Sequence, residues 1–112
     1  MITVEKMNEL GANTAEGLSR CLNNESFYLN LVQMGLKDSG FENLEEAVKK
    51  NDLTKGFEYA HALKGVLGNL SITPLYNDIC EITESLRAKK EIDYSEMLEK
   101  IKTDRAKFLA LI

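Results

Sequence analysis

The chain has 112 residues, of which 44% are hydrophobic and 29% are charged, and its formal net charge is −4. This length fits one domain with a single modest core, which excludes a large multidomain enzyme. No apolar run approaches the roughly 20 residues of a membrane span, and the lysines are scattered rather than gathered into the basic stripe that nucleic acids require. We therefore expect a single folded domain over residues 1–112, with neither a membrane nor a nucleic acid as its partner.

Strand signals are nearly absent, because no segment sustains an alternation of apolar and polar residues. Helical spacing instead follows a short N-terminal segment, residues 1–12, and continues through residues 13–112. We expect Asn13 or Thr14 to cap a first helix, and the pair Asn23 and Asn24 to separate it from a second. The expected helices cover about residues 14–22, 25–37, 42–50, 54–71, 74–89, and 94 to near the C-terminus.

Two helix starts carry recognisable capping residues. Thr73 followed by Pro74 is typical of an N-cap and a first helical residue, the position that proline tolerates best. Asp93 is the expected cap of the last helix. All connections are short, so we expect consecutive helices to pack antiparallel. The sequence therefore predicts an all-α fold, an antiparallel up-and-down four-helix bundle with additional short N-terminal helices.

Apolar stripes mark the faces expected to form the core. The stripe of the helix at 74–89 contains Leu75, Ile79, Ile82 and Leu86. The stripe of the last helix contains Tyr94, Met97, Ile101, Phe108 and Ile112. The helix at 25–37 is apolar on more than one side, with Phe27, Leu31 and Met34 on one side and Tyr28 and Val32 beside them. Two explanations of this wide apolar surface are open: the helix is buried between the bundle and the N-terminal helix, or part of it forms a docking surface for a partner.

Two cysteines, Cys21 and Cys80, lie far apart in the sequence, beside apolar neighbours and without the spacing of a metal site. We expect two reduced thiols in a core rather than a disulfide framework. The opening residues MITVEKMNEL contain no basic segment followed by an apolar one, so no signal peptide is expected. These features favour a cytoplasmic protein.

The only histidine, His61, lies in the long helix at 54–71. On a helical wheel the core stripe of this helix contains Ala60, Leu63, Leu67 and Leu70, and His61 lies nearly opposite. The side of His61 also carries Phe57, Lys64, Gly65 and Gly68, with Glu58 at its edge. The wheel therefore predicts an imidazole in water at the middle of a helix.

The glycines at 65 and 68 are not explained by stability, because each costs about 1 kcal/mol relative to alanine in an exposed helix interior. We infer that Gly65 and Gly68 leave a bare strip along which another protein approaches His61. Lys64, one turn after His61, adds a positive charge. A nucleophile, a bare approach and one cation suit a phosphoryl group.

An exposed imidazole presents an unprotonated nitrogen at neutral pH, so it needs no general base. Phosphoryl transfer also requires charge neutralisation, usually by Mg²⁺, but the chain has no second histidine, no Gly-rich phosphate loop and no acidic Mg²⁺ cluster. We therefore expect a phosphoryl carrier rather than an enzyme, with no metal or cofactor of its own and with catalysis on the partner. Phe57 is expected to be an exposed docking contact, and Glu58 a solvated charge or a group that orients the imidazole.

The run AHALKGVLGNLS, which contains His61, Lys64, Gly65 and Leu70, resembles the signature of histidine phosphotransfer (HPt) domains. In that signature A-H-x-L-K-G is followed by small residues and L-G, and the resemblance extends over about residues 13–90. It implies a helical bundle whose surface histidine accepts a phosphoryl group from a receiver-domain aspartate and passes it to another receiver, or the reverse. It further implies that His61 is the phosphoacceptor, that Lys64 neutralises the phosphate and that Gly65 gives access to the ring.

The chain departs from the family pattern at several positions. Ser71 and Ile72 replace the usual Gly-Ala pair, Val66 and Leu67 are larger than the usual small residues, and Gly35 falls about where the family often has an aromatic residue. The first two of these changes lie near the expected core face, where we expect them to alter packing or the choice of partner. None of them removes a chemical group from the transfer site.

The resemblance implies response-regulator receiver domains or a hybrid sensor histidine kinase as partners in a multistep phosphorelay, with Mg²⁺ on the receiver. The expected docking residues are Phe57, Glu58 and Gly68 with Phe27 and Tyr28, and we expect a monomer. The initial Met and the final helix favour a free-standing protein over the phosphoacceptor domain of a larger histidine kinase. A non-phosphorylated HPt-like adaptor or inhibitor that only binds signalling partners is the third alternative.

Overall fold

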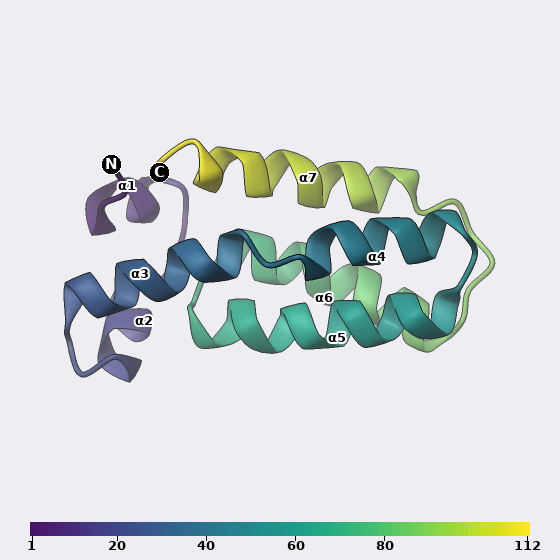
Figure 1. Cartoon of the computed structure of the whole chain (residues 1–112), viewed down its shortest axis with the longest axis horizontal. Helices are drawn as coiled ribbons and strands as arrows, with labels where there is room; N and C mark the ends of the chain where they lie inside the picture. The colour runs from purple at the N-terminus through teal and green to yellow at the C-terminus, as the bar shows by residue number, and fades with distance from the viewer.

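A computed structural model describes all 112 residues and contains seven α-helices and no β-strand. The helices are α1 (Val4–Glu9), α2 (Thr14–Arg20), α3 (Glu25–Leu36), α4 (Gly40–Lys49), α5 (Leu53–Asn69), α6 (Thr73–Arg87) and α7 (Ser95–Leu109). Helix α5 packs on both α4 and α6, and α7 packs on α6 and α3, which gives the up-and-down bundle of Figure 1. The expected all-α bundle with short N-terminal helices is confirmed. None of the helices combines the length and the apolarity that crossing a bilayer requires.

Helices α3 and α4 follow one another in nearly the same direction (Figure 1), so the expectation that all consecutive helices pack antiparallel is wrong here. The links that reverse the chain between α4, α5, α6 and α7 each contain a residue with positive φ, namely Asn51, Ser71 and Lys89. The α3–α4 link contains none, and Ser39 keeps right-handed helical angles. Asp38 Oδ1 accepts a hydrogen bond from the Gly40 N–H at 2.7 Å, which starts α4 at once.

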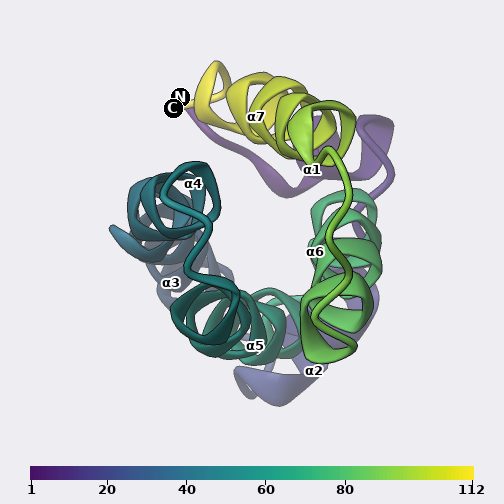
Figure 2. The same ribbon diagram turned by 90° about the vertical axis from the view of Figure 1, so that its right-hand side faces the viewer.

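In the end-on view of Figure 2, α4, α5, α6 and α7 surround one part of the core, and Met7 of α1 with Tyr28, Val32 and Leu36 of α3 extends it. The predicted stripe of α6 is confirmed, since Leu75, Ile79, Ile82 and Leu86 are buried. Of the predicted stripe of the last helix, Ile101 and Phe108 on α7 and Tyr94 at its N-cap are buried, and Met97 is half-buried. Ile112 is exposed, against expectation, because α7 ends at Leu109. Both cysteines are free as predicted, with Cys21 buried and Cys80 half-buried.

One predicted cap is confirmed, since the Asn13 side chain accepts a hydrogen bond from a backbone N–H of α2. Asn24 and Asp52, which were not predicted as caps, do the same for α3 and α5. Two predictions are off by one residue. The N-cap of α6 is Ile72 rather than Thr73, whose hydroxyl donates to the Ser71 carbonyl at 3.3 Å. The N-cap of α7 is Tyr94, although Asp93 Oδ1 still accepts from the Ser95 N–H at 2.9 Å.

Two departures from the family pattern compensate each other where α3 crosses α5. A Cβ atom at Gly35 would lie 2.7 Å from Leu70 Cδ1 and 3.2 Å from Val66 Cγ1, so a side chain does not fit there without movement. The larger Val66 on α5 occupies space that a larger residue on α3 would need. This exchange of volume lets the C-terminal end of α3 approach the C-terminal end of α5, the helix that carries His61.

Candidate functional site

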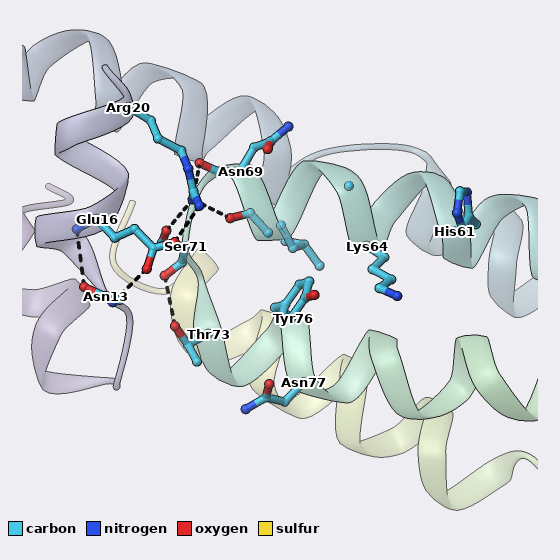
Figure 3. Close-up of a pocket in the computed structure, with 13 residues that line it drawn as sticks. Asn13, Glu16, Arg20, His61, Lys64, Asn69, Ser71, Thr73, Tyr76 and Asn77 are labelled. Carbon is cyan, nitrogen blue, oxygen red and sulfur yellow. Dashed lines mark hydrogen bonds and ion pairs between the residues drawn. The ribbon is translucent and has the colours of Figure 1, made fainter. Parts of the chain in front are cut away.

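His61 lies at the middle of α5 and is exposed, while Ala60 and Leu63 beside it in the sequence are buried. The arrangement predicted by the helical wheel is therefore correct. A depression of about 580 Å³ adjoins the imidazole and extends along α5 toward α2 and the start of α6 (Figure 3). Its lining is mostly polar and includes Lys64, Asn69, Ser71, Tyr76 and Asn77. The depression is an open, polar surface beside the only imidazole.

The two glycines of this surface differ in what surrounds them. A Cβ atom at Gly65 would have no heavy atom within 4 Å, so no contact inside the protein requires glycine there. A Cβ atom at Gly68 would lie 3.0 Å from the ring of Tyr76, which packs over it from α6. Gly65 thus leaves the helix bare one turn after His61. The inference that Gly68 does the same is wrong, because Tyr76 covers it.

Lys64 is the cation of this surface that makes no ion pair. Its side chain lines the same depression as His61 and extends from α5 toward α6 (Figure 3). Arg20 of α2, by contrast, is fully engaged at the far end of the depression. Its Nη1 donates to the Gly68 carbonyl at 2.8 Å and to Ser71 Oγ at 2.9 Å, and its Nη2 pairs with Glu16 at 2.6 Å. Only Lys64 is therefore free to meet an incoming anion.

Sequence reasoning missed Arg20 because its partners lie about 50 positions further along the chain. Arg20 neutralises the carbonyl end of α5, where the helix leaves acceptors without partners. Ser71 adopts a φ of 56°, the left-handed region in which the family's usual glycine is unstrained. Its hydroxyl accepts the bond from Arg20, a contact that glycine cannot make.

The ring of Phe57 is the neighbour of the imidazole on α5. The two ring centroids are 5.5 Å apart and the rings are tilted by 31°. Phe57 is half-buried where exposure was expected, because the guanidinium of Arg87 lies over its ring at 4.9 Å. Glu58 is exposed and forms no hydrogen bond or ion pair, so it does not orient the imidazole. His61 itself forms no hydrogen bond within the protein.

A comparison with protein-family models matches the Hpt domain over residues 38–110, well over half of the chain. The chain belongs to the Hpt domain family. Hpt domains are phosphocarriers that serve histidine phosphotransfer in two-component signalling, where they interact with response-regulator receiver domains. Searches of curated proteins and of solved structures find no significant match.

The matched segment of this Hpt domain covers helices α4 to α7 and contains His61, Lys64 and Gly65. It reaches further toward the C-terminus than the predicted resemblance over about residues 13–90, and it leaves out α1 to α3. The excluded helices still contact the site, because Arg20 of α2 binds the end of α5. No group of three His, Cys, Asp or Glu side chains is arranged to hold a metal ion.

Of the two aromatic residues at the start of α3, Phe27 lies on the surface of the Hpt domain and Tyr28 lies in its core. Phe27 is 51% exposed, and Met34, two turns later, is 69% exposed. Tyr28 is fully buried, its hydroxyl donates to the Leu70 carbonyl at 2.8 Å, and burial raises the pKa of Tyr28 to about 12. The prediction that Tyr28 contacts a partner is therefore wrong. Its ring instead lies over Gly17 of α2, where no side chain fits.

Proposed function

We propose that this Hpt domain carries a phosphoryl group on His61, which it accepts from a receiver-domain aspartate and passes to a second receiver. The observation that supports this most is the setting of the imidazole. The only histidine of the chain is exposed at mid-helix, next to a bare glycine at Gly65 and an unpaired cation at Lys64. A histidine with a structural role would be buried or held by hydrogen bonds, whereas His61 is exposed and forms no hydrogen bond within the protein.

The chemistry fits a neutral imidazole. Its unprotonated nitrogen attacks the phosphorus of the aspartyl phosphate, a P–N bond forms, and the P–O bond to the aspartate breaks. The aspartate leaves as a carboxylate and therefore needs no proton. Because the reacting nitrogen carries no proton either, neither direction of transfer requires a general acid or base at His61.

Lys64 neutralises charge on the phosphoryl group once it is bound. The lysine lies three residues after His61, on the same side of the helix, and has no competing carboxylate. We place the remaining charge neutralisation on the receiver, whose Mg²⁺ and carboxylates supply the catalysis. This division makes the Hpt domain a carrier that delivers an oriented nucleophile and one cation.

The docking face that we propose consists of Phe27, Met34, Glu58 and Gly65, on α3 and α5. Phe27 and Met34 are exposed apolar side chains on α3, which packs closely on α5 at Gly35. Glu58 and Gly65 form the solvent side of α5 around His61. Such a mixed and modest face suits a transient complex, which a relay protein must leave in order to meet its next partner.

The test is to incubate the protein with a phosphorylated receiver domain and Mg²⁺ and to assay for acid-labile, base-stable phosphate. The wild type should become labelled, and His61→Gln should not, while its free energy of unfolding stays within about 0.5 kcal/mol of wild type because the ring lies outside the core. Label on His61→Gln would disprove the site. Label from a histidine kinase's ATP but from no receiver would favour the phosphoacceptor domain of a larger kinase, and label from neither donor would favour a binding-only adaptor.

A further inference from the structure

A stack of side chains from two helices leads up to the imidazole. Glu84 Oε2 lies 3.2 Å from Arg87 Nε on α6. The Arg87 guanidinium lies 4.9 Å from the centre of the Phe57 ring, and that ring lies 5.5 Å from His61. The stack therefore connects the C-terminal end of α6 to the proposed phosphoacceptor on α5.

Phe57 is the fixed member of this stack. It is half-buried and packs against the hydrophobic core, so its ring has little freedom to move. Phe57 and His61 are four residues apart in the helix, a spacing that brings side chains into contact. His61 has no hydrogen bond to define its orientation, so the face of Phe57 is the surface against which the imidazole rests.

We propose that Phe57 and Arg87 are positioning residues for His61, an inference that rests on the proposed phosphoacceptor role. Phe57 confines the imidazole to orientations that hold its reactive nitrogen outward. Arg87 covers Phe57 by a cation–π contact, and the ion pair with Glu84 holds the Arg87 guanidinium in place. Orientation matters for this reaction because a misplacement of about 1 Å can cost up to about a hundredfold in rate.

If Phe57 positions His61, its loss should lower the transfer rate at saturating receiver, whereas if Phe57 is a docking residue, its loss should lower the affinity for the receiver. Phe57→Leu keeps an apolar side chain but removes the ring, and we expect the transfer rate at saturating receiver to fall about tenfold with little change in receiver affinity. Arg87→Gln should lower the same rate about two- to fivefold, the factor that an exposed cation–π contact is worth, and Arg87→Lys should restore part of it. The matched controls are Tyr59→Leu, a half-buried aromatic elsewhere on α5, and Lys90→Gln, an exposed cation beyond α6. Both should behave as wild type.

A second readout needs no phosphate. Because the chain has a single histidine, its imidazole signals in a heteronuclear NMR spectrum belong to His61 without assignment. In Phe57→Leu the ring-current shift of these signals should disappear and the imidazole should become more mobile. Arg87→Gln should show a smaller change in the same direction, and Tyr59→Leu none. A denaturation curve for each variant establishes that the compared proteins are folded.

Two results would overturn the inference. One is an imidazole that is equally ordered in wild type and Phe57→Leu. The other is a loss of receiver affinity at an unchanged saturated rate, which would make Phe57 a docking residue. Failure of the wild type to accept any phosphate would instead overturn the proposed function, while the NMR comparison would still decide whether the stack orients the ring. Should Phe57→Leu prove unfolded, the comparison of Arg87→Gln with Arg87→Lys carries the test.

Discussion

The carboxyl group of Asp78 makes the stability of this fold depend on pH. Asp78 lies on α6 and is 4% exposed, and its Oδ2 has no hydrogen-bond partner. Lys100 of α7 lies 3.4 Å from Oδ1, and Asp104 of α7 faces the same site. Burial first, and then the neighbouring Asp104, raises the pKa of Asp78 from 3.8 to about 7, against the opposing effect of Lys100.

The sign of the effect follows from proton uptake. In the unfolded chain Asp78 loses its proton near its ordinary pKa of 3.8, whereas the folded protein keeps that proton up to a pKa of about 7. The stabilisation from Asp78 is therefore complete below pH 4 and is lost as the pH rises toward 7. Each pKa unit corresponds to about 1.4 kcal/mol, so the loss over this window is at most about 4 kcal/mol.

Asp78→Asn resembles the protonated side chain at every pH. We expect this variant to match wild type near pH 3 and to exceed it at pH 8 by about 2–4 kcal/mol, as measured by urea denaturation. Asp104→Asn removes the neighbouring carboxylate and should reduce the loss in the wild-type curve without abolishing it. A wild-type stability that is constant from pH 4 to pH 7, or an Asp78→Asn variant that is less stable at pH 8, would show that Lys100 keeps Asp78 ionised and would refute the reasoning.

Three further predictions concern the transfer surface and the bundle. Gly65→Ala should raise the free energy of unfolding by about 0.5–1 kcal/mol because the added Cβ contacts no other group. Gly68→Ala should give no such gain because Tyr76 lies over that position. Urea denaturation of both variants measures the two free energies of unfolding. Lys64→Ala should shorten the phosphohistidine lifetime without a change in receiver affinity, and Gly65→Leu should weaken receiver binding; equal effects of both variants on binding alone would contradict this division. Arg105→Lys should destabilise the fold by about 1 kcal/mol in thermal unfolding, since one ammonium cannot reproduce the guanidinium bonds to a carbonyl and a carboxylate; an unchanged unfolding curve would contradict this.

Periodicity was sufficient to predict the parts of the fold that repeat along a helix. The stripe on α6 and the placement of His61 away from the core stripe of α5 follow from 3.6 residues per turn alone, and both are confirmed. Asp78 lies one turn after Leu75, at the border of the same stripe. Its burial could therefore have been suspected from the wheel.

Features that depend on contacts between distant segments could not be predicted. Whether the α3–α4 link reverses the chain depends on single backbone angles, which the local composition does not specify. Phe27 and Tyr28 are adjacent aromatic residues on a helix that is apolar on several sides, and Tyr28 is the buried one because its partners, Gly17 of α2 and the Leu70 carbonyl, lie in other segments. The packing of Tyr76 on Gly68 is likewise a contact between two different helices, which the periodicity of either helix alone does not predict.

The proposal that His61 carries a phosphoryl group between receivers is best tested by following transfer of the phosphate from the Hpt domain to a receiver. The Hpt domain is labelled from a phosphorylated receiver, purified, and mixed with an unlabelled receiver and Mg²⁺, and the label on each protein is followed with time. A carrier with its phosphate on His61 should lose label as the receiver gains an equal amount, and His61→Gln should carry none at the start. Label that stays on the Hpt domain, or that leaves as inorganic phosphate while the receiver remains unlabelled, would contradict the account.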